Sequence, residues 1–174
     1  DTSTAHRTSE QWIYGFPEVF ENGFEKVKNA NRVAVPGCHA SGFIALVKPL
    51  VDAGVLPADA LITCHSITGY SGGGKQMIAA YEADGRDPLF AGPRQYGLGQ
   101  KHKHLPEMAA ICGLACAPVF CPIVAPYYSG MEVTVPLHAS QVKGGVADLL
   151  AAYRAYYTKG LVRVVDAADE SGFL

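Results

Sequence analysis

The sequence lacks the features that mark several protein classes. It has 14 basic and 16 acidic residues in 174, a net charge of −2, so it has no basic excess with which to bind nucleic acid or an anionic membrane. It has five cysteines, an odd number, which argues against a framework of disulfides. No two of them form a Cys-x-x-Cys pair, which argues against a zinc site. The polar opening does not match a secretory signal. These absences predict a cytoplasmic protein that binds no metal, no membrane and no nucleic acid.

Charge is also absent from residues 108–131, a run long enough to raise the question of a membrane span. Prolines and glycines interrupt this run repeatedly, so we interpret it as the end of a buried helix followed by buried strands. Hydrophobic residues make up 49% of the chain and charged residues 17%, which is typical of a folded globular domain.

The most informative residue of the sequence is Cys38, in the segment Val-Pro-Gly-Cys-His-Ala-Ser-Gly at residues 35–42. The segment follows a strand-like run and begins an apolar helix-like run. A thiol at a helix N-terminus faces unpaired backbone N–H groups and the positive end of the helix dipole, and both favour the nucleophilic thiolate. Cys38 is therefore a candidate nucleophile, and a buried thiol with a purely structural role is the alternative.

Hydrophobic periodicity places strands and helices in a mixed order. The predicted strands are residues 32–35, 59–68, 119–125, 131–138 and 161–166, and the predicted helices are residues 38–53, 75–83, 102–112 and 146–158. The consecutive strands favour antiparallel pairing, and residues 1–31 are expected to cover the domain without a core of their own. The sequence predicts an α+β fold, a mixed, mostly antiparallel sheet covered by helices.

A second motif is His-Lys-His-Leu-Pro-Glu, residues 102–107. Its proline suits the first turn of a helix, so the histidines lie where a loop runs into that helix. His102 is a candidate general acid or base, because the pKa of histidine lies near neutral pH. Glu107 is a candidate to orient it. The alternative is a solvated loop with two surface histidines, His102 and His104.

A glycine-rich turn spans residues 69–75 and ends in Lys75. Gly69-x-Ser71-x-Gly73 matches the nucleophile-elbow pattern of serine hydrolases, and an aspartate and the histidines follow in the required order. The other interpretation is a turn whose backbone N–H groups and lysine bind an anion. The turn matches neither the dinucleotide-binding nor the Walker pattern. Near the start of the chain, Arg7 is a candidate for bidentate binding of a carboxylate or phosphate.

Taken together, these motifs resemble one family, the shorter type of N-acetyl-γ-glutamyl-phosphate reductase. The resemblance rests on Asp-Thr-Ser-Thr-Ala-His-Arg at residues 1–7, Tyr-Gly-Phe-Pro-Glu at 14–18, Pro-Gly-Cys at 36–38, the segment 66–75 and the histidine motif at 102–107. It implies a catalytic domain like that of glyceraldehyde-3-phosphate dehydrogenase, with helices on one face of its sheet.

The resemblance also implies roles for particular residues. Cys38 corresponds to the nucleophile, His102 to the acid or base, and Glu107 to its support. Tyr96, six residues before His102, corresponds to a tyrosine that lines the site. Arg7, Ser71, Lys75 and His104 are expected to contact the substrate.

Departures from the family pattern are visible. The family segment Ser-Gly-x-Ser-Gly-Ala-Gly differs here, at residues 66–74. Val35 and His39 flank Pro-Gly-Cys where the family often has asparagine and an aromatic residue. The NADP-binding Rossmann domain of the family is also missing, so we interpret residues 1–174 as a catalytic, substrate and dimerisation domain that binds no cofactor alone. We expect it to partner its own NADP-binding domain and to form a homo-oligomer through residues 146–157 or the strands after residue 118.

The resemblance implies that NADPH reduces an acyl phosphate to N-acetylglutamate semialdehyde. Cys38 forms a thioester, hydride gives a thiohemiacetal oxyanion, and His102 donates a proton to it. The domain alone is expected to form the thioester without reducing it. A related acyl phosphate that is one carbon longer is an alternative substrate. A serine hydrolase that uses Ser71 and a non-catalytic assembly domain are the alternatives.

Overall fold

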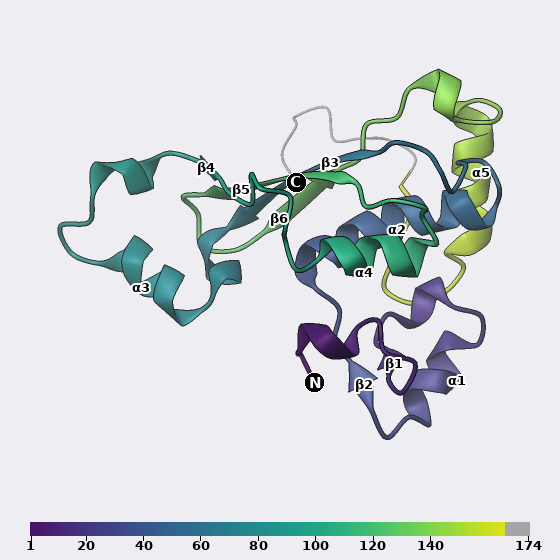
Figure 1. Cartoon of the computed structure of the whole chain (residues 1–174), viewed down its shortest axis with the longest axis horizontal. Helices are drawn as coiled ribbons and strands as arrows, with labels where there is room; N and C mark the ends of the chain where they lie inside the picture. The colour runs from purple at the N-terminus through teal and green to yellow at the C-terminus, as the bar shows by residue number, and fades with distance from the viewer. Residues whose placement is uncertain (166–174) are drawn as a thin grey trace.

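A mixed four-stranded sheet lies at the centre of the computed structural model, which describes residues 1–165 (Figure 1). The strand order is β4-β5-β3-β6. The strands are β3 (Thr63–Gly69), β4 (Arg94–Gln95), β5 (Val119–Ala125) and β6 (Met131–Thr134). β3 pairs in parallel with β5 and antiparallel with β6, and β4 pairs antiparallel with β5. The prediction of a mixed sheet is confirmed.

β5 and β6 are consecutive in the chain but do not pair, because β3 lies between them. The connection between them passes the end of β3 and is hydrogen-bonded to it: Gly69 N–H donates to the Gly130 carbonyl, and Tyr70 N–H donates to the Tyr127 carbonyl. These backbone bonds hold the start of the glycine-rich turn against this connection.

The helices cover one face of the sheet. β3 alternates as its sequence predicts, with Cys64, Ser66 and Thr68 buried and His65 and Ile67 exposed. Helices α2 (Cys38–Asp52) and α4 (Leu105–Cys112) lie together below the sheet in Figure 1, and α5 (Val146–Tyr156) packs on α2. α2 supplies much of the core through four apolar side chains, all at most 1% exposed: Phe43, Ile44, Val47 and Leu50.

Pro49 lies inside α2, yet the helix continues to Asp52. A proline inside a helix removes the hydrogen bond to the carbonyl four residues earlier, here that of Ala45. The hydroxyl of Tyr157 donates to the Ala45 carbonyl at 2.8 Å, and that of Tyr153 donates to the Leu46 carbonyl at 2.6 Å. Tyr153 of α5 and Tyr157, which follows α5, therefore satisfy the backbone around the proline.

The first 31 residues cover the domain, as predicted. They contain β1 (Ile13–Tyr14), which pairs in parallel with β2 (Val33–Ala34), and α1 (Gly23–Lys28). Single 3-10 turns lie at Thr4–His6 and Pro17–Val19. Tyr14 and Val19 are the residues of this segment that enter the main buried cluster.

The segment after β3 extends away from the sheet, at the left of Figure 1. It contains η3 (Tyr70–Gly73), α3 (Lys75–Glu82) and η4 (Pro88–Ala91), and a further turn, η5 (Ala139–Gln141), precedes α5. The predicted last strand is wrong for residues 161–165, which pair with no strand in the described chain, and residue 166 lies outside the described residues. None of the helices within residues 1–165 has the length and hydropathy to cross a lipid bilayer.

Candidate active site

Cys38 is the first residue of α2, as the Pro-Gly-Cys motif predicts, and its thiol is exposed. It lies on a pocket of about 290 Å³ that is also lined by His39, Tyr96, His102 and His104. The first N–H groups of a helix have no intrahelical acceptor, so those at the start of α2 are free to bind a negative charge beside the sulfur. The pocket therefore combines an exposed thiol, three histidines and a helix end that can stabilise an anion.

A buried carboxylate fixes the backbone immediately before Cys38. Glu107 is 1% exposed, and its Oε1 accepts hydrogen bonds from the Gly37 N–H at 2.8 Å and the Tyr14 hydroxyl at 2.6 Å. Its Oε2 accepts from Arg7 Nη1 at 3.0 Å. The charge of Arg7 compensates that of Glu107, because a buried charge is stable only when it is paired.

Glu107 was predicted to orient His102, but its hydrogen bonds go elsewhere. Its partners are Arg7, Tyr14 and Gly37, and no histidine within residues 1–165 donates to it. The sequence could not reveal this, because these partners lie 70 to 100 residues away from Glu107. Glu107 instead holds the turn that precedes Cys38.

Arg7 was predicted to bind substrate, and the structure gives it protein partners. It is 7% exposed, and besides Glu107 it donates to the carbonyls of Val35 and Thr2. Arg7 lines the pocket while all three nitrogens of its guanidinium are already engaged. Arg7 thus ties the N-terminal segment to the Pro-Gly-Cys turn.

Three histidine rings pack together in the pocket that Cys38 lines. The ring centroids of His102 and His104 are 4.6 Å apart, and His39 lies 6.0 Å from His102 and 5.7 Å from His104. Burial lowers the pKa of His39 to about 4 and that of His104 to about 3. Burial and the neighbouring Lys103 charge lower the pKa of His102 as well. All three rings are therefore mainly neutral near pH 7.

The contacts of His102 indicate which nitrogen carries its hydrogen. The N–H of His104 donates to Nδ1 of His102 at 3.2 Å. A neutral ring whose Nδ1 accepts carries its hydrogen on Nε2, so His102 has an N–H donor on that nitrogen. His104 is buried, and its own Nδ1 has no hydrogen-bond partner in the described part of the chain.

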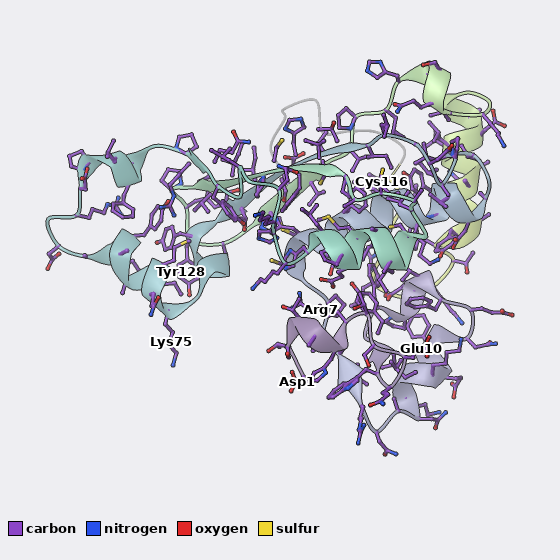
Figure 2. The ribbon with its side chains drawn as sticks, viewed as in Figure 1. Asp1, Arg7, Glu10, Lys75, Cys116 and Tyr128 are labelled. Atoms are coloured by element: carbon purple, nitrogen blue, oxygen red, sulfur yellow. The ribbon has the colours of Figure 1, made fainter. Side chains whose placement is uncertain are left out.

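Ser71 and Lys75 lie outside the pocket lining. Ser71 belongs to η3 and makes no hydrogen bond to a histidine among residues 1–165, so the geometry of a serine nucleophile is not formed. Lys75 is exposed and points away from the body of the protein (Figure 2). The glycine-rich turn instead contributes Gly72 and Gly73 to the pocket.

Tyr96 follows β4 and reaches the pocket, as the resemblance implies. Burial and the nearby Cys38 raise the pKa of its hydroxyl to about 12, so it remains protonated. The sequence interpretation gave no role to Thr68 and Lys103, which also line the pocket, and noted His39 only as a departure from the family. Residues 1–165 contain no group of three or more histidine, cysteine or acidic side chains placed to hold a metal ion.

Comparison with known proteins places this chain in a family. Residues 38–171 match the family described as semialdehyde dehydrogenase, dimerisation domain. The chain is 44% identical to a Rhizobium meliloti protein named N-acetyl-gamma-glutamyl-phosphate reductase over 100% of its length and 57% of that protein. It is 47% identical to a Chelativorans protein of the same name over 90% of its length and 51% of that protein.

A likeness to solved structures supports the fold. A crystal structure of aspartate semialdehyde dehydrogenase II from Vibrio cholerae matches 97% of this chain and 56% of its own, with a TM-score of 0.62 and 18% identity. The mixed sheet with helices on one face is thus shared with a semialdehyde dehydrogenase. The chain spans little more than half the length of the curated relatives described above.

Proposed function

Because the chain belongs to the semialdehyde dehydrogenase dimerisation-domain family, we propose that it is the catalytic part of an N-acetyl-γ-glutamyl-phosphate reductase. The observation that carries the proposal is the exposed Cys38 at the start of α2, in one pocket with His102 and Tyr96. The names of relatives 44% and 47% identical to it support the choice of substrate. The reaction is reduction of an acyl phosphate to N-acetylglutamate semialdehyde in arginine biosynthesis.

The first chemical step uses Cys38. Its thiolate attacks the acyl carbon, the bond from that carbon to the phosphate oxygen breaks, and inorganic phosphate leaves with the electron pair. The product is a thioester on Cys38. The unpaired N–H groups at the start of α2 are placed to stabilise the negative charge that develops on the acyl oxygen, as an oxyanion hole does.

The second step reduces the thioester, and NADPH bound to the full-length protein supplies the hydride for it. The tetrahedral oxyanion then accepts a hydrogen bond from the Nε2–H of His102, which can also pass its proton to the oxygen. Breaking of the carbon–sulfur bond releases the aldehyde, returns any transferred proton to His102 and frees the Cys38 thiolate.

A separate NADP-binding domain is part of the proposal. The sequence contains no dinucleotide-binding fingerprint, and its glycine-rich turn at residues 69–75 does not match one. The Cys38 thiol is exposed, so a cofactor bound by another domain can reach it. No residue of this chain is assigned to cofactor binding.

The uncovered face of the sheet is the proposed dimerisation surface. On this face β3 and β5 place Ile67 and Val119, which are 36% and 54% exposed. Apolar sheet residues left in contact with water favour association with a second copy. We also propose a cytoplasmic location, which the five free cysteines support.

The direct test is an assay of the full-length protein that contains this chain, hereafter the full-length reductase. We expect it to oxidise NADPH when supplied with N-acetyl-γ-glutamyl phosphate and to release phosphate in equal amounts. If the reductase prefers the acyl phosphate that is one carbon longer, the assigned substrate changes but the proposed chemical steps stay the same. Absence of reduction of either acyl phosphate would overturn the proposal.

Replacing His102 with alanine separates the two chemical steps. Loss of one donor to a developing oxyanion lowers kcat by about a hundredfold to a thousandfold. Stoichiometric phosphate release in the absence of NADPH will remain, because that step depends on Cys38. Stopped-flow recording of phosphate release and of NADPH oxidation measures the rates of the two steps. An equal decrease of both rates would contradict a role of His102 in reduction alone.

A further inference from the structure

His39, the residue after the nucleophile, bridges two hydroxyl groups. It is 3% exposed, and its Nδ1 lies 2.6 Å from Ser66 Oγ while its Nε2 lies 2.8 Å from the Tyr96 hydroxyl. Ser66, in the interior of β3, is 0% exposed, and its hydroxyl donates to the backbone carbonyl of Glu132 in β6 at 3.2 Å. A continuous hydrogen-bonded chain thus runs from the sheet to a tyrosine in the pocket.

The direction of each hydrogen bond follows from counting hydrogens. A serine hydroxyl has one hydrogen, and Ser66 donates it to the Glu132 carbonyl, so Ser66 Oγ accepts from His39. His39 then carries its hydrogen on Nδ1, which leaves Nε2 as an acceptor. Within residues 1–165, the hydrogen-bond partner of Nε2 is the Tyr96 hydroxyl, which therefore donates its hydrogen to this nitrogen. Burial lowers the pKa of His39 to about 4, which keeps the ring neutral and this arrangement intact near pH 7.

Tyr96 is left with lone pairs and no hydrogen to offer the pocket. We propose that His39 is a positioning residue that makes the Tyr96 hydroxyl a hydrogen-bond acceptor for an N–H group of the substrate. A carboxylate or phosphate oxygen has no hydrogen to donate there, whereas the secondary amide of an N-acylated amino acid has one. Tyr96 thereby selects an acyl phosphate that carries an amide N–H. This inference rests on the proposed function for its substrate.

The hydrogen position on His39 can be measured without any activity. The full-length reductase is labelled with ring-¹⁵N histidine, and the His39 signal is identified by its loss in His39→Gln. We expect nitrogen shifts of a neutral ring with its hydrogen on Nδ1 at pH 7. A ring with its hydrogen on Nε2, or a charged ring, would overturn the proposal even if the protein is a reductase.

The substrate preference is tested in the reverse direction with two aldehydes. One is 2-acetamido-5-oxopentanoate, and the other is its 2-acetoxy analogue, in which an ester oxygen replaces the amide N–H. We expect kcat/KM with phosphate and NADP⁺ to favour the amide by about tenfold or more, since the analogue leaves the Tyr96 oxygen unpaired. In Tyr96→Phe the preference should fall to within about twofold.

A matched pair of variants tests His39 itself. The oxygen of a glutamine can take the place of Nε2 and accept from Tyr96, so His39→Gln should keep most of the preference. The shorter asparagine reaches Ser66 but not Tyr96, so His39→Asn should lose it. Equal preferences in the two variants would assign His39 a packing role and overturn the proposal. Failure of the unaltered reductase to oxidise either aldehyde would instead count against the proposed function.

Discussion

Replacing Cys38 with serine will reduce turnover of the full-length reductase by at least about a thousandfold. A serine hydroxyl at the same position lacks a thiolate's nucleophilicity, and no histidine hydrogen bond to Cys38 is present in the described residues to activate such a hydroxyl. NADPH oxidation under saturating acyl phosphate measures the effect.

The exposed Cys116 provides the control for this substitution. It lies apart from the pocket lining, between α4 and β5, and is also a free thiol (Figure 2). Cys116→Ser should retain the activity of the unaltered protein within about twofold, as surface substitutions usually do. Comparable activity of Cys38→Ser and Cys116→Ser would contradict the assignment of Cys38 as the nucleophile.

The second large effect concerns stability. Replacing Glu107 with glutamine will lower the free energy of unfolding by about 3–5 kcal/mol, because it leaves the buried Arg7 charge uncompensated. It also replaces an acceptor oxygen facing Arg7 or Gly37 with an amide donor. Urea unfolding followed by circular dichroism measures the change.

Two comparisons isolate the buried ion pair. Arg7→Met combined with Glu107→Gln should be less destabilising than the sum of the two single changes, because the double variant buries no unpaired charge. Glu25→Gln, which removes an exposed ion pair with Lys28, should change the unfolding free energy by no more than about 0.5 kcal/mol. If Glu107→Gln costs no more than Glu25→Gln, the buried network is not what holds the turn.

Local features of this fold could be predicted from the sequence. Pro-Gly-Cys marks the start of α2 at Cys38, and period-two alternation identifies the buried face of β3. Both depend on residues close together in the chain, where propensity and periodicity act directly. The position of His102 at the head of α4 follows from the neighbouring Pro106 for the same reason.

Features that depend on distant residues could not be predicted. The place of β3 between β5 and β6 is set by contacts across the sheet, and nothing in the hairpin-like sequence of residues 119–138 reveals it. The pairing of Glu107 with Arg7 joins residues 100 positions apart. Lys75 was expected at the substrate because it ends a glycine-rich turn, but the side-chain direction is fixed by the fold of α3.

The central claim is that Cys38 forms a thioester with the acyl group, and it can be tested by mass spectrometry. Full-length reductase is mixed with freshly prepared N-acetyl-γ-glutamyl phosphate without NADPH, quenched in acid and digested. We predict an N-acetylglutamyl adduct on the peptide that contains Cys38, removed by later addition of NADPH. The buried Cys64 and Cys112, whose thiols have pKa values raised to about 12 by burial, should stay unmodified. An adduct on Ser71, or none on any residue, would contradict the mechanism.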